Sequence, residues 1–120
     1  MGLFDKVFGK GNHAASSQDI IETMLASAAA CMEQGQYDRA AETYKKVLEL
    51  QPNAIAQYNL GSLYAQGKGV AHNFMEGAYW FRQASLSGDE QAEKLCTRCI
   101  MDAVHQDLED KTAESIYQDL

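Results

Sequence analysis

The segment "QYDRAAETYKKVLEL" (Gln36–Leu50) places an aromatic, a small and a second aromatic side chain on one face of a helix. Tyr37, Ala40 and Tyr44 follow one another at intervals of three and four residues, which is the spacing of neighbours on an α-helix. A small residue between two rings lets another helix approach closely while the rings pack beside it. The segment therefore predicts a helix that packs against a second helix along this face.

The same pattern returns further along the chain. In "NFMEGAYWFRQASLS" (Asn73–Ser87), Phe74, Gly77 and Phe81 repeat the aromatic, small, aromatic spacing 37 positions later. The stretches that precede each of these segments also carry an apolar stripe at helical spacing, with a small residue in its middle. A recurrence of this kind predicts a repeat protein built from pairs of helices.

Capping residues divide the chain into helices. The signals are Ser16 or Ser17 before the first helix, Gly35 after it, Pro52 with Asn53 between the second and third, Asn73 with Glu76 before the fourth, and Gly88 with Asp89 before the fifth. We predict helices over residues 18–33, 37–50, 54–66, 74–87 and 89–104. A final helix to about residue 118 is either separate or continuous with the fifth, because no glycine or proline divides them.

We predict one all-α domain at residues 16–120, preceded by a mobile leader at residues 1–15. Hydrophobic residues make up 46% of the chain and proline occurs once, which favours helices joined by short turns. Seventeen acidic residues against ten basic ones give a net charge of −7, and this balance argues against nucleic-acid binding. Three cysteines and no convincing signal peptide predict a reducing, cytoplasmic location.

Two stretches resemble known repeats. "EQGQYDRAAETYKKVLELQPN" (Glu33–Asn53) resembles the second helix of a tetratricopeptide repeat, and "AQYNLGSLYAQGKGVAHNFMEGAYWFRQASLSGD" (Ala56–Asp89) resembles a Sel1-like repeat. The matching residues are Gly35, Tyr37, Ala40, Tyr44 and Pro52 in the first, and Leu60, Gly61, Tyr64, Gly67, Gly69, Val70, Trp80, Phe81, Ala84 and Gly88 in the second.

The resemblance implies an all-α, right-handed α-α superhelix of antiparallel helix pairs. About two and a half repeats and a C-terminal capping helix would form it. The units would be residues 18–52, residues 54–88, and an incomplete or capping unit at residues 89–120.

The glycines of "GSLYAQGKGVAHN" (Gly61–Asn73) suggest a phosphate-binding loop, but the spacing is wrong for one. A P-loop needs four residues between its glycine and Gly-Lys, followed by Ser or Thr, whereas here five residues intervene and Gly69 follows the lysine. We interpret Gly67 and Gly69 instead as turn residues with positive φ in a helix–helix connection that is four residues longer than the first one.

The resemblance also implies a function, which is non-catalytic binding of a protein or peptide along the concave face. The first helix of each pair lines that face in this family. The predicted binding residues are Glu22, Met32, Glu33, Tyr58, Asn59, Ser62, Gln66, Lys94, Arg98 and Met101. The identity of the protein or peptide partner does not follow from the sequence, and no cofactor is predicted.

Two other functions stay open at this point. An unfinished last repeat exposes an end that could join two chains in a homodimer, unless the final helix caps it. Cys96 and Cys99 share a helical face and could bind a metal or act in redox chemistry, although tetrahedral zinc needs two further ligands.

The N-terminal segment "MGLFDKVFGK" (residues 1–10) is amphipathic. Leu3, Phe4, Val7 and Phe8 fall on one helical face, and Lys6 and Lys10 accompany them. This pattern fits a disordered leader, docking on a partner or on the chain itself, or weak contact with a membrane.

Overall fold

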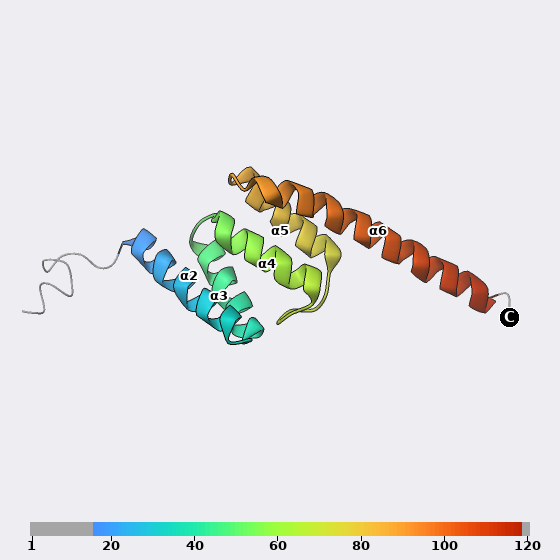
Figure 1. The fold of residues 1–120 in the computed structure, drawn as a ribbon, viewed down its shortest axis with the longest axis horizontal. Coiled ribbons are helices and arrows are strands. Elements are labelled where there is room, and N and C mark those ends of the chain that lie inside the picture. Colours follow the sequence, from blue (N-terminus) through green and yellow to red (C-terminus); the bar gives the residue numbers. More distant parts are fainter. Residues whose placement is uncertain (1–15, 119–120) are drawn as a thin grey trace, which may run out of the picture.

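The computed structural model describes the backbone of residues 16–118 and the side chains of residues 16–111. This part of the chain forms five helices: α2 (Ser17–Glu33), α3 (Tyr37–Leu50), α4 (Ala54–Gln66), α5 (Phe74–Leu86) and α6 (Glu90–Gln118). No strand occurs among the described residues, so the all-α prediction is confirmed (Figure 1).

Local capping explains where the helices begin. Ser16 and Asp19 form a reciprocal capping box at the start of α2. The side chains of Asn53 and Asn73 accept hydrogen bonds from the third backbone N–H groups of α4 and α5, at 2.9 and 3.0 Å. Gly67 ends α4 in the left-handed conformation at φ 66°, as the sequence predicts.

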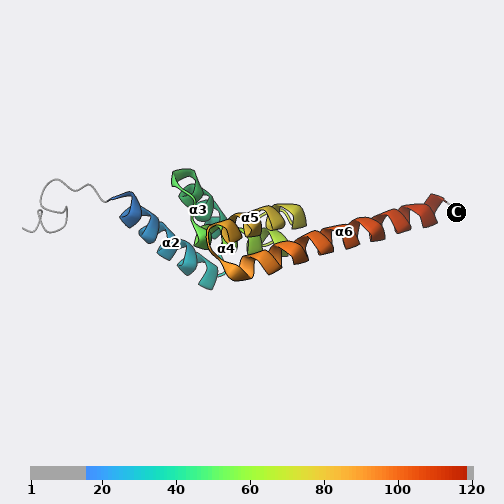
Figure 2. The same cartoon turned by 90° about the horizontal axis from the view of Figure 1, so that it is seen from above.

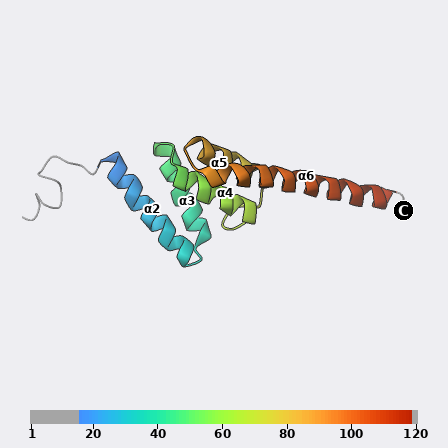
Figure 3. The ribbon, with the colours of Figure 1, turned by 45° about the horizontal axis from the view of Figure 1, so that its top comes forward.

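Consecutive helices pack against each other along the chain. α2 packs on α3, α3 on α4, α4 on α5 and α5 on α6. All three views show α4, α5 and α6 side by side, while α2 and α3 form the other end of the molecule (Figures 1, 2 and 3). A predominance of contacts between neighbouring elements is typical of a repeat architecture.

The last helix is one continuous element, which decides between the two alternatives for the C-terminal region. α6 has 29 residues and α5 has 13, so the two helices are roughly 43 and 20 Å long. About half of α6 therefore extends beyond the helix on which it packs, as Figures 1 and 2 show.

The apolar interior consists of two clusters that meet at α4. The first cluster joins α2, α3 and α4 through buried residues such as Ile21, Tyr44 and Leu60. The second joins α5 and α6 through Phe81 and Cys99, among others. Burial of the Tyr44 ring raises the pKa of its hydroxyl, because ionisation would place a charge in this interior.

α4 and α5 approach each other closely at two glycines. A Cβ atom at Gly77 would lie 3.1 Å from the carbonyl oxygen of Gly61 and 3.3 Å from Cβ of Ala65. A Cβ atom at Gly61 would lie 3.1 Å from the ring of Phe81. These small residues allow the two backbones to pack tightly, which is the role that the repeated sequence pattern predicts.

Gly69, in the turn between α4 and α5, lies against the first helix pair. Its φ is 73°, and a Cβ atom at this position would collide with the backbone of Tyr37 at the start of α3. Lys68 lies beside this contact, with its Nζ 5.1 Å from the centre of the Tyr37 ring. The two glycines of the predicted turn, Gly67 and Gly69, therefore have positive φ, and Gly69 also admits a neighbouring backbone.

A buried amide fastens the start of α4 to the end of α5. Gln57 is 4% exposed. With its amide nitrogen turned toward α5, its two N–H groups are shared among three acceptors, the Ser87 hydroxyl (2.9 Å) and the carbonyl oxygens of Gln83 and Asn53 (both 3.2 Å). These bonds satisfy a polar group that would otherwise be costly to bury.

Replacement of Gln57 by alanine should lower the free energy of unfolding by about 2 kcal/mol, because hydrogen bonds and packing are lost together. Asn59→Ala is the matched control on the same helix. The Asn59 amide bonds only locally, donating to the carbonyl oxygen of Ile55 at 2.8 Å, so its loss should change stability by less than about 0.5 kcal/mol. Urea unfolding measures both values, and equal effects of the two variants would contradict the fastening role of Gln57.

Candidate functional site

A groove of about 420 Å³ runs between α4 and α6, with α5 beneath it. Neighbouring repeats leave such a depression because the first helices of successive units are separated by the helix that packs between them. Its lining comes from Tyr58, Ser62, Ala65 and Gln66 on α4, Phe74 and Phe81 on α5, and Leu95, Arg98, Cys99 and Asp102 on α6.

The middle of the groove is apolar. The ring of Phe81 is 3% exposed and meets the Tyr58 ring edge-on, with centroids 5.5 Å apart and planes at 71°. Leu95 and Phe74 are half-buried beside these rings. Partly exposed rings over a packed base offer a rigid surface for an apolar side chain.

The rim of the groove carries charged and polar groups. Arg98 and Asp102 lie one helical turn apart on α6, and Ser62 and Gln66 lie one turn apart on α4. Within the described residues neither Arg98 nor Asp102 forms an ion pair, so both charges can interact with a bound molecule.

Cys99 lies at the base of this groove on the α6 side. Burial raises the pKa of its thiol, and the nearby Asp102 carboxylate raises it further. A raised pKa leaves little thiolate at neutral pH, whereas redox and metal-binding cysteines need the thiolate. Among the residues described here, no three His, Cys, Asp or Glu side chains gather closely enough to hold a metal ion.

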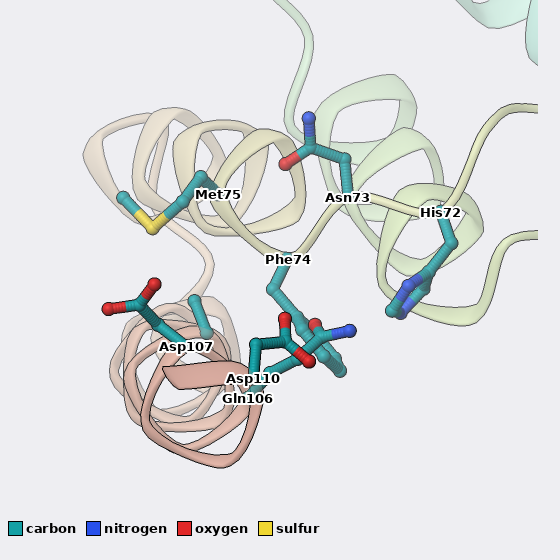
Figure 4. A pocket seen from close by; sticks show the side chains of 8 residues that line it. His72, Asn73, Phe74, Met75, Gln106, Asp107 and Asp110 are labelled. Carbon is teal, nitrogen blue, oxygen red and sulfur yellow. The ribbon is translucent and has the colours of Figure 1, made fainter. Parts of the chain in front are cut away.

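A second cavity of about 280 Å³ adjoins the groove where α6 passes the start of α5. Figure 4 shows Phe74 between the loop before α5 and the acidic side chains of α6. The lining consists of His72, Asn73, Phe74 and Met75 on one side and Ala103, Gln106, Asp107 and Asp110 on the other. Phe74 lines both cavities, so the groove, which is apolar near Phe81, adjoins a cavity that is acidic near Asp110.

The structure brings together four of the ten predicted binding residues. Tyr58, Ser62, Gln66 and Arg98 all line the groove. Asn59 lies outside its lining, as do the exposed residues Lys94 and Met101 on α6.

The three predicted residues on α2 lie apart from this groove. Glu22 and Glu33 are exposed there, and Met32 is half-buried against the first apolar cluster. α2 packs mainly on α3, so its residues belong to the other end of the molecule.

The sequence did not predict that the second helix of a pair contributes residues to the groove. Phe74 and Phe81 come from α5 and line the groove from below. Their aromatic spacing was visible in the sequence, but the same spacing also fits side chains that are entirely buried. The acidic run Asp107 to Asp110 was visible as well, and only the straight course of α6 places it beside Phe74.

Comparisons with known proteins identify two repeats in the chain. Residues 28–67 match the family model of the TPR repeat, and residues 54–89 match that of the Sel1 repeat. No curated protein and no solved structure matches the chain. Repeats of these two kinds are generally non-catalytic scaffolds for protein–protein interaction.

None of the helices within residues 16–118 combines the length and the apolar character needed to cross a lipid bilayer. The predicted contact of residues 1–10 with a membrane or a partner concerns positions outside the described part of the chain.

Proposed function

Because the chain carries TPR and Sel1 repeats, we propose that it binds a segment of a partner protein in the groove between α4 and α6. The observation that carries this proposal is an apolar base, formed by Tyr58 and Phe81, beside the cation Arg98 on the rim. Among the residues that the structure describes, no carboxylate forms an ion pair with Arg98. Apolar contact would supply most of the affinity, and the charges would fix the direction of the bound segment.

The chemistry of the groove and of the adjoining cavity defines the segment that they would accept. An apolar or aromatic side chain fits over Phe81, and a carboxylate fits beside Arg98. A lysine or arginine further along the segment fits the adjoining acidic cavity at Asp107 and Asp110. Ser62 and Gln66 add hydrogen-bonding groups to the backbone of an extended segment.

The three cysteines support a reducing compartment for this function. Cys31, Cys96 and Cys99 are all free thiols. Thiols that remain unpaired are typical of proteins that work in the cytoplasm, where disulfides are rare.

A displayed library of random peptides tests the groove while the natural partner is still unidentified. Peptides that are selected on the full chain should lose affinity by about tenfold or more in the Tyr58→Ala/Arg98→Glu variant, because an aromatic contact and a charge pair are lost together. Fluorescence polarisation with labelled peptides measures the change.

The matched control is Tyr79→Ala/Arg82→Glu. It makes the same two substitutions at exposed positions on α5 that do not line the groove. Its affinity for the selected peptides should stay within about twofold of the wild type, since surface substitutions remote from an interface have little effect. If both double variants bind equally well, or lose affinity equally, the groove is not the binding site.

A further inference from the structure

The face of α6 that points away from α5 carries a second apolar surface. Ile100, Met101, Val104 and Leu108 are 42%, 66%, 55% and 57% exposed. Val104 is four residues after Ile100 and three after Met101, and Leu108 is four residues further on, so the four side chains fall along one stripe. This stripe lies on the other side of α6 from Leu95, Cys99 and Asp102, which face α5 and the groove, so it is separate from the proposed peptide site.

The repeat pattern relates this stripe on α6 to a face of α4. On α4, Gly61 and Ala65 form the face that receives α5. The positions 36 residues later on α6 are Thr97 and Met101. The stripe of α6 is therefore the face onto which the second helix of a third unit would pack, and its large apolar side chains remain exposed instead.

We propose that α6 of a second copy of this chain covers the stripe, in an antiparallel pair with its two-fold axis near Val104. An isologous contact of this kind buries the same stripe on both chains. Thr97 and Met101 are larger than Gly61 and Ala65, so the two helices would pack at the ordinary spacing of about 8–10 Å rather than at the close approach of α4 and α5.

The charges along α6 select the antiparallel orientation. The first part of the helix is balanced, with Glu90 and Glu93 against Lys94 and Arg98. The later part is acidic, with Asp102, Asp107, Glu109 and Asp110 against Lys111.

With the axis near Val104, Lys111 of one copy comes near Glu93 of the second copy. A parallel pair would place the acidic parts side by side, and like charges at that distance repel. The charge pattern thus fits a second copy in the reversed direction.

Sedimentation equilibrium on the full chain tests the pairing. We expect a monomer–dimer equilibrium between low micromolar and near-millimolar protein, because one helix pair makes a small interface. The Met101→Glu/Val104→Glu variant should raise the dissociation constant by about tenfold or more. The control Ile55→Glu/Leu86→Glu introduces the same charges at exposed apolar residues of α4 and α5, and it should dimerise like the wild type.

Engineered cysteines test the orientation. In the antiparallel pair, residue 104 of one chain lies near residue 104 of the other across the axis. Oxidation of the Val104→Cys variant should therefore produce a covalent dimer. Residue 108 faces Ile100 of the second copy, so the two cysteines of a Leu108→Cys dimer are too far apart to cross-link. The wild type serves as the control, since Cys31 and Cys99 are buried and Cys96 is half-buried.

Three results would overturn the proposal. A chain that stays monomeric up to near-millimolar concentration has no such pair. Efficient cross-linking through both Val104→Cys and Leu108→Cys would show a parallel pair. A dimer that disappears when residues 1–15 are deleted would show that the amphipathic N-terminal segment, and not a second α6, occupies the stripe.

Discussion

Replacement of Gly69 by alanine should lower the free energy of unfolding by more than about 3 kcal/mol, a loss that few single methyl groups cause. Two effects combine at this position. The left-handed conformation at φ 73° costs an L-residue about 1–2 kcal/mol. The added Cβ atom must also displace the backbone at Tyr37, which belongs to the start of another helix and cannot rotate away as a side chain would.

Gly35→Ala separates these two effects. Gly35 has nearly the same φ, 75°, but apart from its two chain neighbours no residue has an atom within 4 Å of the position that its Cβ would occupy. This variant should therefore lose only the conformational term of about 1–2 kcal/mol. Urea unfolding of the two variants gives the comparison directly, and equal losses would mean that the contact between Gly69 and Tyr37 does not constrain the fold.

Truncation of Phe81 to alanine should cost about 3–5 kcal/mol, because a nearly buried ring is removed from between α4, α5 and α6. Phe81→Leu keeps most of the volume and should cost less than about 1.5 kcal/mol. The midpoint of urea unfolding should shift without a large change in slope if the native fold is retained.

Phe74→Ala is the control for Phe81. Phe74 lines the same groove but is only half-buried, so less apolar surface is lost on truncation and the cost should be about 1–2 kcal/mol. A Phe81→Ala variant as stable as Phe74→Ala would contradict the assignment of Phe81 to the core beneath the groove.

The helix boundaries could be predicted from sequence because capping is local. Ser16 bonds to Asp19 and Asn73 bonds to the N–H of Glu76, each within one helical turn. The positive φ of Gly67 and Gly69 could be predicted for the same reason, since a turn that ends a helix needs such residues.

Contacts between residues that are far apart in the sequence could not be predicted from such local signals. Gly69 and Tyr37 are 32 positions apart, and only the stacking of the two helix pairs brings them together. The groove was predictable in part because its α4 and α6 residues repeat with the unit, as Ser62 and Arg98 do 36 positions apart. The place of Phe74 in it depends on how α5 tilts between its neighbours, and no spacing in the sequence encodes that angle.

The course of α6 illustrates the same limit. Its sequence contains no glycine or proline, which is compatible with one long helix and equally with two shorter helices. The second cavity depends on that outcome, since Asp107 and Asp110 come beside Phe74 only when the helix continues straight past α5.

The contact between Gly69 and Tyr37 also bears on cooperativity. In a stack where each element touches only its neighbours, units can open one at a time from either end. Here the α4–α5 connection packs on the start of α3, so opening of the first helix pair disturbs the connection inside the second. The first two units should consequently open as a single foldon.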